Sequence, residues 1–188
     1  EFAKQQTLFH WELEFPQIFY CENGEKNIDG GFDIILGNPP YIEVKKIDDV
    51  LKPYIRKRFQ YEKKEIIKGR YDIFWVFMVQ GLNLLKKGGY MGFLTEDSIL
   101  DAVGANTLRE FLLKESTIIN LSFTGKFPGA AVYTSISIIK KEKKDDYEFL
   151  LDNWVTKIKI QLKKSFILNQ HKQIINLNWT KQNTQDLE

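Results

Sequence analysis

The fold is decided by the stretch Gly31-Phe32-Asp33-Ile34-Ile35-Leu36-Gly37-Asn38-Pro39-Pro40-Tyr41. Its first half is short, apolar and rich in β-branched residues, with glycines before it and prolines after it. This pattern is typical of a buried strand that ends in a sharp loop. We therefore predict a strand over 32–37 with the loop 38–41 at its carboxyl end. Open α/β sheets bind their ligands at that end, so the loop is the first candidate site.

Alternating helices and strands are predicted downstream of this loop. Apolar residues follow the helical period from Asp72 to Lys87, with Asp72 in the capping position and Gly88-Gly89 at the exit. Further elements are predicted as strand 90–94, helix 106–114, strand 117–123 and strand 132–139. This order predicts an α/β fold with a parallel sheet, and the alternating strand 132–139 suits an antiparallel position at its edge.

The chain is divided here into a catalytic region, 1–141, and a remainder, 142–188. The remainder alternates at Trp154, Val155, Ile158 and Ile160 with long polar intervals between them. We expect it to be a strand-rich C-terminal extension or the start of another region.

Composition excludes several classes of protein. Of the 188 residues, 43% are apolar and 28% charged, which is the balance of a globular protein and excludes disorder. No apolar run reaches the roughly 18 residues that cross a bilayer, and the first residues lack a signal-peptide pattern, so we expect a cytoplasmic protein without a membrane partner. Cys21 has no second cysteine to pair with, and His10 and His171 lack partners at ligand spacing, so no metal site is predicted.

The loop carries groups that suit a planar amino group on a ring. The side-chain oxygen of Asn38 and the carbonyl of Pro39 can each accept one amino hydrogen, while Tyr41 can stack on the ring; Pro40 stiffens the loop. Two such acceptors favour the tetrahedral nitrogen on which positive charge develops as a methyl group arrives. An exocyclic amine such as adenine N6 fits this description. The plainer reading of a double proline is a rigid turn.

Several blocks together resemble a known family, the amino-group DNA methyltransferases that make N6-methyladenine. The blocks are 9–16, 31–42, 71–74 with the helix to 89, 92–95 and 127–129, and they resemble the gamma-type branch found in fused type IIG restriction–modification enzymes. The resemblance implies a Rossmann-like sheet that uses S-adenosylmethionine. It implies the site residues as follows: Asn38, Pro39, Pro40 and Tyr41 catalytic, Tyr41 and Phe127 stacked on the two faces of the extruded base, and Asp72, Phe74 and Phe77 beside the methyl donor.

The family's Gly-rich cofactor turn has no counterpart before Asn38, because Gly30-Gly31 precedes a strand instead of following one. We therefore expect this chain to be the catalytic half of the sheet, with the cofactor-binding half missing and supplied by the N-terminal part of the same polypeptide. Strand 32–36 would then keep an open edge, which residues 1–30 or a second copy of the chain should cover. Alone, the chain should be inactive and bind S-adenosylmethionine weakly.

Basic residues gather between the loop and the first long helix. Residues 45–70 hold ten Lys or Arg against four acids, and such a stretch can follow the phosphates of double-stranded DNA, although a solvated lysine-rich face is the alternative. The candidate DNA-binding residues are Lys45, Lys46, Arg56, Lys57, Arg58, Lys63 and Lys64.

Two other functions stay open from the sequence. Glutamine N5 methyltransferases that act on proteins carry the same tetrapeptide, because a carboxamide nitrogen is also planar. The chain could also be a non-catalytic piece that binds DNA or a partner. The basic stretch and Phe127 both favour a methyltransferase that acts on DNA.

Overall fold

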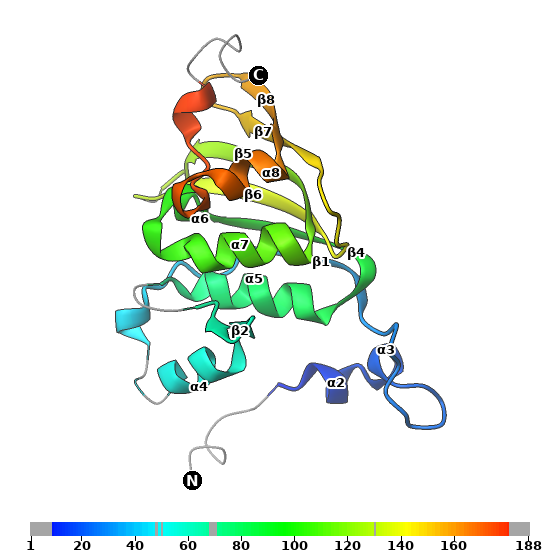
Figure 1. The fold of residues 1–188 in the computed structure, drawn as a ribbon. Coiled ribbons are helices and arrows are strands. Elements are labelled where there is room, and N and C mark those ends of the chain that lie inside the picture. Colours follow the sequence, from blue (N-terminus) through cyan, green and yellow to red (C-terminus); the bar gives the residue numbers. More distant parts are fainter. Residues whose placement is uncertain (1–8, 48, 50, 68–70, 130, 181–188) are drawn as a thin grey trace.

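A six-stranded sheet forms the centre of the computed structural model, which describes residues 9–47, 49, 51–67, 71–129 and 131–180 (Figure 1). The strands lie in the order β1 (Phe32–Gly37), β4 (Leu85–Glu96), β6 (Tyr133–Lys140), β5 (Thr117–Lys126), β7 (Glu148–Asn153) and β8 (Ile158–Lys163). β1 is parallel to β4 and β5 is parallel to β7, whereas β6 and β8 run antiparallel to their neighbours. The predicted α/β class is confirmed.

Two long helices, α5 (Ile73–Leu84) and α7 (Asn106–Glu115), lie side by side over one face of the sheet (Figure 1). None of the described helices is long and apolar enough to cross a membrane. The shorter elements are α2 (Trp11–Glu14), α3 (Pro16–Phe19), η1 (Val44–Lys46), α4 (Leu51–Arg58), β2 (Gln60–Tyr61), β3 (Lys64–Glu65), α6 (Ser98–Asp101), η2 (Val103–Ala105), α8 (Lys164–Asn169), η3 (His171–Gln173) and η4 (Leu177–Thr180).

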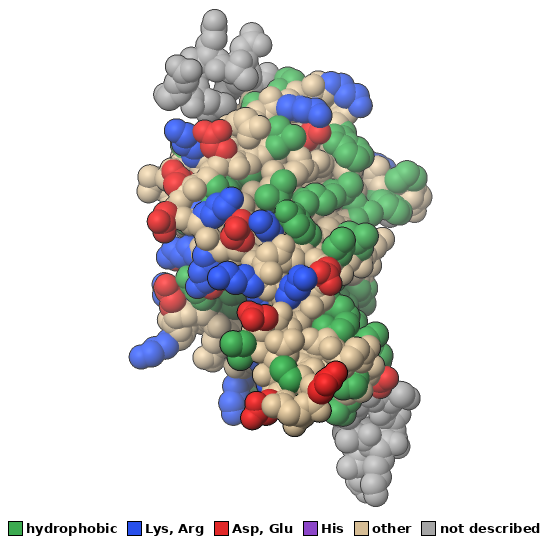
Figure 2. Space-filling view, turned by 90° about the vertical axis from the view of Figure 1, so that its right-hand side faces the viewer, with side chains coloured by type: hydrophobic (Ala, Val, Ile, Leu, Met, Phe, Trp, Pro, Cys, Tyr) green, Lys and Arg blue, Asp and Glu red, His purple; other side chains and the backbone are tan. Residues whose placement is uncertain are grey.

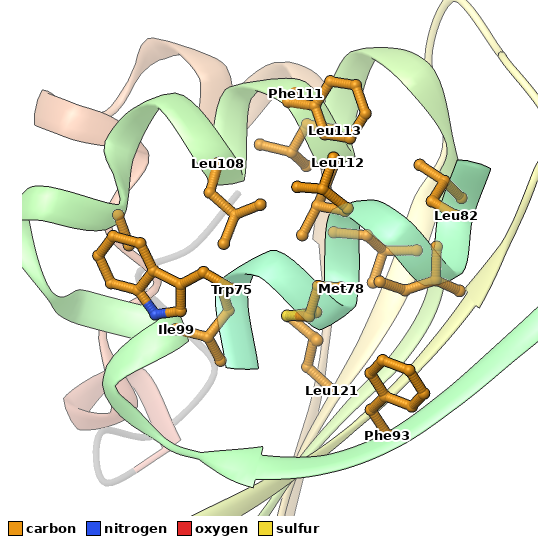
Figure 3. Packing of buried hydrophobic residues seen from close by; sticks show 14 of the residues in the cluster. Trp75, Met78, Leu82, Phe93, Ile99, Leu108, Phe111, Leu112, Leu113 and Leu121 are labelled. Carbon is orange, nitrogen blue, oxygen red and sulfur yellow. The ribbon is translucent and has the colours of Figure 1, made fainter. Parts of the chain in front are cut away.

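The core lies between these two helices and the sheet. Figure 3 shows Trp75 and Met78 of α5 meeting Leu108 and Leu112 of α7 above the sheet, and all four are buried. Burying side chains of this size stabilises the fold by roughly 1.5–3 kcal/mol each. This packing fixes the carboxyl end of β4 beneath α5 and α7.

The opposite face of the sheet is less covered. Along β1 the side chains alternate, so that Ile35 points toward the core while Ile34 and Leu36 are 61% and 76% exposed. Figure 2, which views the molecule from the right-hand side of Figure 1, shows hydrophobic side chains gathered over the right half of that view. β1 is thus an apolar strand at the edge of the sheet.

The first long helix ends earlier than predicted. It stops at Leu84, not at Lys87, and the two lysines expected in its last turn belong to β4. Leu85 already pairs with Phe32 of β1, and Lys141 donates to the backbone carbonyls of Asn83 (3.1 Å) and Leu85 (2.5 Å). Pairing with the neighbouring strand therefore outweighs the helical pattern.

The strand β6 is antiparallel, as predicted, but it does not lie at the edge. It lies between β4 and β5, with Ser137 opposite Phe93 and Ser135 opposite Thr95. Both serines are fully buried beneath the helices. The serine side of this strand therefore faces inward, and its isoleucines at 136 and 138 are only partly buried.

The region after 140 is strand-rich only as far as Lys163. β7 and β8 extend the same sheet, Trp154 and Val155 lie in the turn between them, and α8 and two 3-10 helices follow. The division of the chain at 141 stays a prediction.

The N-terminal segment packs its aromatic rings against the start of β1. Rings of Trp11, Phe15 and Phe19 meet the ring of Phe32 at centroid distances of 5.7, 5.4 and 5.5 Å. Residues 9–30 therefore leave Ile34 and Leu36 uncovered, contrary to the expected cover over the strand, and residues 1–8 lie outside the described part. Association of two chains through this edge stays a prediction.

Candidate active site

The proline loop, residues 38–44, leaves β1 at Gly37. A Cβ at Gly37 would lie 3.1 Å from the ring of Phe93, so glycine lets the strand pass closely over this ring. Pro39 is buried, whereas Asn38 and Pro40 are exposed. The loop thus starts from a fixed point and presents the Asn38 side chain to solvent.

Backbone hydrogen bonds hold the end of the proline loop against the start of α5. The N–H of Val44 donates to the carbonyl of Tyr71 (2.8 Å), and the N–H of Ile73 donates to the carbonyl of Ile42 (2.9 Å). Glu43 and Asp72 form the bridge between these bonds. The residues that precede α5 are therefore placed beside the loop, as the predicted site requires for Asp72.

A cavity of about 910 Å³ opens beside the loop, at the carboxyl ends of β1 and β4. Its lining includes Tyr41, the buried side chains of Tyr71 and Trp75, and Val132 from the hairpin between β5 and β6. Charged residues of both signs complete the lining: Glu43, Lys45, Lys46, Asp72, Glu96 and Lys172. A cavity with aromatic surfaces and a few polar groups is the usual form of a ligand site.

The electrostatics of the cavity oppose ionisation of Glu96. Burial raises the pKa of Glu96, and the neighbouring Asp72, Asp97 and Glu43 raise it further. Burial also raises the pKa of Tyr41, with Glu96 as the second cause. The carboxyl of Glu96 and the ring of Tyr41 therefore influence each other within one cavity.

The Tyr41 hydroxyl donates a hydrogen bond to the side-chain oxygen of Asn38 at 2.7 Å. A second, longer contact joins this hydroxyl to the carbonyl of Leu94 at 3.5 Å. Asn38 is exposed and lies outside the cavity lining, next to Tyr41, and the bond shows that its side-chain oxygen is available as an acceptor at the edge of the cavity. An incoming amino group can take the place of the hydroxyl at the same acceptor.

The predicted partner of Tyr41, Phe127, lies at the tip of the hairpin between β5 and β6. It is half-buried, and it lines a separate open hollow with Lys126, Pro128 and Gly129. Its N–H donates to the carbonyl of Val132, a residue of the main cavity. The structure therefore brings Phe127 to the neighbourhood of the cavity but not into its lining, and the stacking of both rings on one base stays a prediction.

The three residues predicted beside the methyl donor are separated by the structure. Asp72 lines the cavity, Phe74 lies in the core without exposed surface, and Phe77 is 44% exposed on α5 outside the cavity lining. Asp72 is thus the member of the set that a ligand in this cavity can reach.

The predicted DNA-binding residues lie on three neighbouring elements. Lys45 and Lys46 end η1 and line the cavity, Arg56, Lys57 and Arg58 form the last turn of α4, and Lys63 and Lys64 lie in the hairpin of β2 and β3. Only the first pair belongs to the cavity. Residues 68–70 of the basic stretch lie outside the described part.

Three charged residues of the cavity, Glu43, Glu96 and Lys172, were missed by the sequence reasoning. Glu96 follows the strand predicted over 90–94, so the rule that ligands bind at carboxyl ends of strands could have found it. Lys172 is brought there by tertiary contacts alone, and no local signal marks it. Among the described residues, no group of His, Cys, Asp and Glu is arranged to hold a metal ion.

Comparison with known proteins identifies relatives of the region that contains the proline loop. A family model described as Eco57I restriction-modification methylase matches residues 1–128. A protein of Methanocaldococcus jannaschii, named provisionally as the type II restriction enzyme and methyltransferase RM.MjaORFECS2P, is 32% identical over 157 residues, which are 80% of this chain and 11% of that protein. The adenine-specific methyltransferase BrxX of Escherichia coli O9:H4 (strain HS) is 27% identical over 122 residues, 62% of this chain and 10% of that protein.

Solved structures share the fold. The type I restriction-modification methyltransferase subunit from Streptococcus thermophilus superposes with a TM-score of 0.51 at 17% identity, over 80% of this chain and 30% of that one. Because the sequences are only 17% identical, this superposition shows a common fold and nothing further. The chain spans about a tenth of the length of the two relatives above.

Proposed function

This chain belongs to the Eco57I restriction-modification methylase family, and we propose that it carries the catalytic site that transfers a methyl group to N6 of adenine in DNA. The observation that supports this most is the proline loop itself, in which the Asn38 oxygen accepts a hydrogen bond at 2.7 Å beside the ring of Tyr41. The predicted resemblance to adenine methyltransferases of restriction–modification systems is confirmed at the level of the family.

The proposed chemistry needs hydrogen-bond acceptors more than a strong base. An extruded adenine would stack on Tyr41, and its amino group would replace the Tyr41 hydroxyl as the donor to Asn38, with the Pro39 carbonyl as the second acceptor. Both acceptors stabilise the positive charge that develops on the nitrogen. The buried Pro39 and the close passage of Gly37 over Phe93 support this role, because they limit the movement of the loop.

S-adenosylmethionine is the proposed methyl donor, and when bound it supplies an electrophilic methyl group. It carries a sulfonium and an ammonium group, and the carboxyl groups of Asp72 and Glu96 line the cavity, where a bound cation would favour the ionised form of Glu96. Asp72 is placed beside the proline loop by the pairing of residues 42–44 with 71–73. We therefore assign Asp72 to the donor and the Tyr41 ring to the base.

The main binding motif for this donor is proposed to lie in another part of the polypeptide, next to β1. The exposed side chains of Ile34 and Leu36 support this placement, because an apolar edge strand is a template for a further strand. The chain alone would then be inactive, and double-stranded DNA would be its macromolecular substrate. A restriction nuclease fused to it, as the name of the M. jannaschii relative states for that protein, is part of the same proposal.

The test is an identification of the methylated product. The longest natural polypeptide that contains these residues is incubated with labelled S-adenosylmethionine and either DNA or a glutamine-containing release-factor peptide, and the products are digested and separated by mass. N6-methyladenine in the DNA supports the proposal. Methylcytosine alone or methylglutamine alone would contradict it, and the variant Asn38→Ala serves as the inactive control.

A further inference from the structure

The C-terminal segment 164–175 adds a lysine residue to the lining of the cavity beside the proline loop. α8 and η3 pass beside α7, and Lys172 of η3 lines the same cavity as Tyr41 and Lys46. Lys172 lies beyond the residues that the family model matches. We infer that Lys172 binds the DNA phosphate next to the extruded adenine; this inference rests on the proposed function and assigns a residue to it.

The position of Lys172 is fixed by a buried arginine. Arg109 of α7 is 3% exposed, and its guanidinium donates to the backbone carbonyl of Lys172 at 2.8 Å. The other guanidinium nitrogen donates to the carbonyls of Ala102 (2.9 Å) and Ile99 (3.1 Å). Burial lowers the pKa of Arg109 to about 10, so it keeps its charge at neutral pH and makes strong, charge-assisted bonds.

The segment is tied to the cavity at a second point. The N–H of Ile175 donates to the carbonyl of Leu100 at 2.8 Å, and Ile175 is buried. We call residues 99–105 and 171–175 the tethered rim, because Arg109 and this bond join the two stretches. Ala102 and Lys172, one from each stretch, both line the cavity.

Lys172 has a strained backbone within this rim. Its φ of 54° and ψ of 25° lie in the left-handed region, which a residue with a side chain adopts at a cost in energy. The Arg109 bond holds the carbonyl in that conformation. The backbone of Lys172 is therefore fixed at a place where the residue lines the cavity.

The charges around Lys172 fit an anion at the mouth of the cavity. Lys45 forms an ion pair with Glu43 at 2.8 Å, but within the described residues no carboxylate is in ion-pair contact with Lys46 or Lys172. Extrusion of a base rotates its nucleotide and carries the adjoining phosphate to the mouth of the base pocket. A flexible ammonium group suits a single phosphate as a point charge.

The experiment measures DNA binding by the longest natural polypeptide that contains this chain. Fluorescence anisotropy is recorded at several salt concentrations with a duplex whose target adenine is mismatched, so that it flips easily. Lys172→Ala should reduce the log–log salt slope by about 0.9, the value for one lost phosphate contact. A neutral methylphosphonate at the adjoining phosphate should weaken binding by the wild type and have no further effect on Lys172→Ala.

Matched variants separate this contact from general effects. Lys157 also has a left-handed backbone, with φ of 62°, but it lies in the turn between β7 and β8 and not in the cavity lining. Lys157→Ala should therefore keep both the wild-type slope and the sensitivity to the methylphosphonate. Lys172→Arg should restore both, because it returns the charge.

Two results would overturn the inference while leaving the proposed function in place. One is a polypeptide that methylates adenine while Lys172→Ala keeps the wild-type slope and methylphosphonate sensitivity. The other is unchanged DNA binding with a higher KM for S-adenosylmethionine, which would make the cofactor carboxylate the anion. A wild type that methylates no adenine would instead overturn the proposed function itself.

Discussion

Two stretches enclose the cavity, and they hold their shape by different means. The proline loop is stiff because of its own covalent structure, with two fixed φ angles and a buried Pro39. The tethered rim has no such stiffness and is held by the buried side chain of Arg109, which makes three hydrogen bonds, and by the bond from Ile175 to Leu100. The shape of the proline loop is thus determined by adjacent residues, whereas the shape of the tethered rim is determined by contacts between residues far apart in the chain.

The largest effect is expected from breaking the chemistry of the proline loop. Asn38→Ala removes one acceptor for the reacting amine, so kcat should fall by about 10² to 10³ while the unfolding midpoint stays unchanged. Methyl transfer and thermal unfolding are measured on the same preparation. Tyr41→Phe is the matched control: it loses the bond to Asn38 but keeps the ring, so its rate should fall far less. A near wild-type rate for Asn38→Ala would remove Asn38 from the mechanism.

Breaking the tether should cost stability first. Arg109→Ala leaves the carbonyls of Ile99, Ala102 and Lys172 without their donor, and we expect a loss of about 3 kcal/mol in the free energy of unfolding. Denaturant titration measures it. Lys114→Ala, which removes an ion pair with Glu110 on the same helix, should cost less than about 0.5 kcal/mol. Equal losses for the two variants would show that Arg109 does not hold the rim.

Phe127 belongs to neither the proline loop nor the tethered rim, and its removal tests whether a third segment contacts the base. If it stacks on the extruded base opposite Tyr41, Phe127→Ala should weaken binding of a flipped base by about 1–3 kcal/mol. Fluorescence of 2-aminopurine at the target position reports the flipped base. Tyr133→Ala removes an exposed ring from the same hairpin and should leave the signal as in the wild type. An unchanged signal in Phe127→Ala would place Phe127 outside the base site.

Charge reversal in α4 and in the hairpin of β2 and β3 should weaken binding to all DNA sequences alike. The residues to reverse are Arg56, Lys57, Arg58, Lys63 and Lys64. Phosphate contacts carry no base information, so binding should weaken uniformly and its salt slope should fall by about 0.9 for each lost contact. Lys157→Glu is the control at a distant turn. A slope equal to that of the wild type would make these residues a solvated face.

The smallest effect concerns the pH dependence of stability through Glu96. Its pKa is raised in the folded state by burial and by the neighbouring acids. Ionisation of the carboxyl at a pH above its ordinary pKa of 4.5 therefore opposes folding. Glu96→Gln removes this opposition and should be slightly more stable than the wild type at pH 7. Below pH 4.5 the carboxyl is protonated in both states, and the difference should vanish. Unfolding midpoints at pH 4 and pH 7 measure it, and an equal gain at both values would contradict the assignment.

The proline loop could be predicted from the sequence because its determinants are adjacent in the chain. β1 and α7 follow from short-range patterns of apolar residues, prolines and caps, whereas the position of Asp72 beside the methyl donor was implied by the family resemblance alone. The early end of α5 and the interior position of β6 could not be predicted. Both depend on a neighbouring strand that competes with the local pattern. The half-buried Lys141 donates to the carbonyl of Leu85 where α5 ends, and Ser137 is fully buried although serine is mostly a surface residue.

The tethered rim marks the limit of such reasoning. Arg109 lies within a predicted helix where a charged residue is expected to face solvent, and Lys172 lies 63 positions further along the chain. Their contact joins residues without any shared motif. Glu96 could be predicted in part. Its position at the end of a strand follows from the sequence, whereas its neighbours Asp72 and Glu43 come from other elements.

The tether has a consequence for biosynthesis. The proline loop and most of the sheet leave the ribosome long before Lys172, and the carbonyl that Arg109 binds does not exist until that residue has been added. A nascent chain therefore carries the acceptor for the reacting amine while one side of the cavity is still missing. If Lys172 binds the DNA phosphate as proposed, this contact can form only after the helices and strands beneath the cavity have been synthesised.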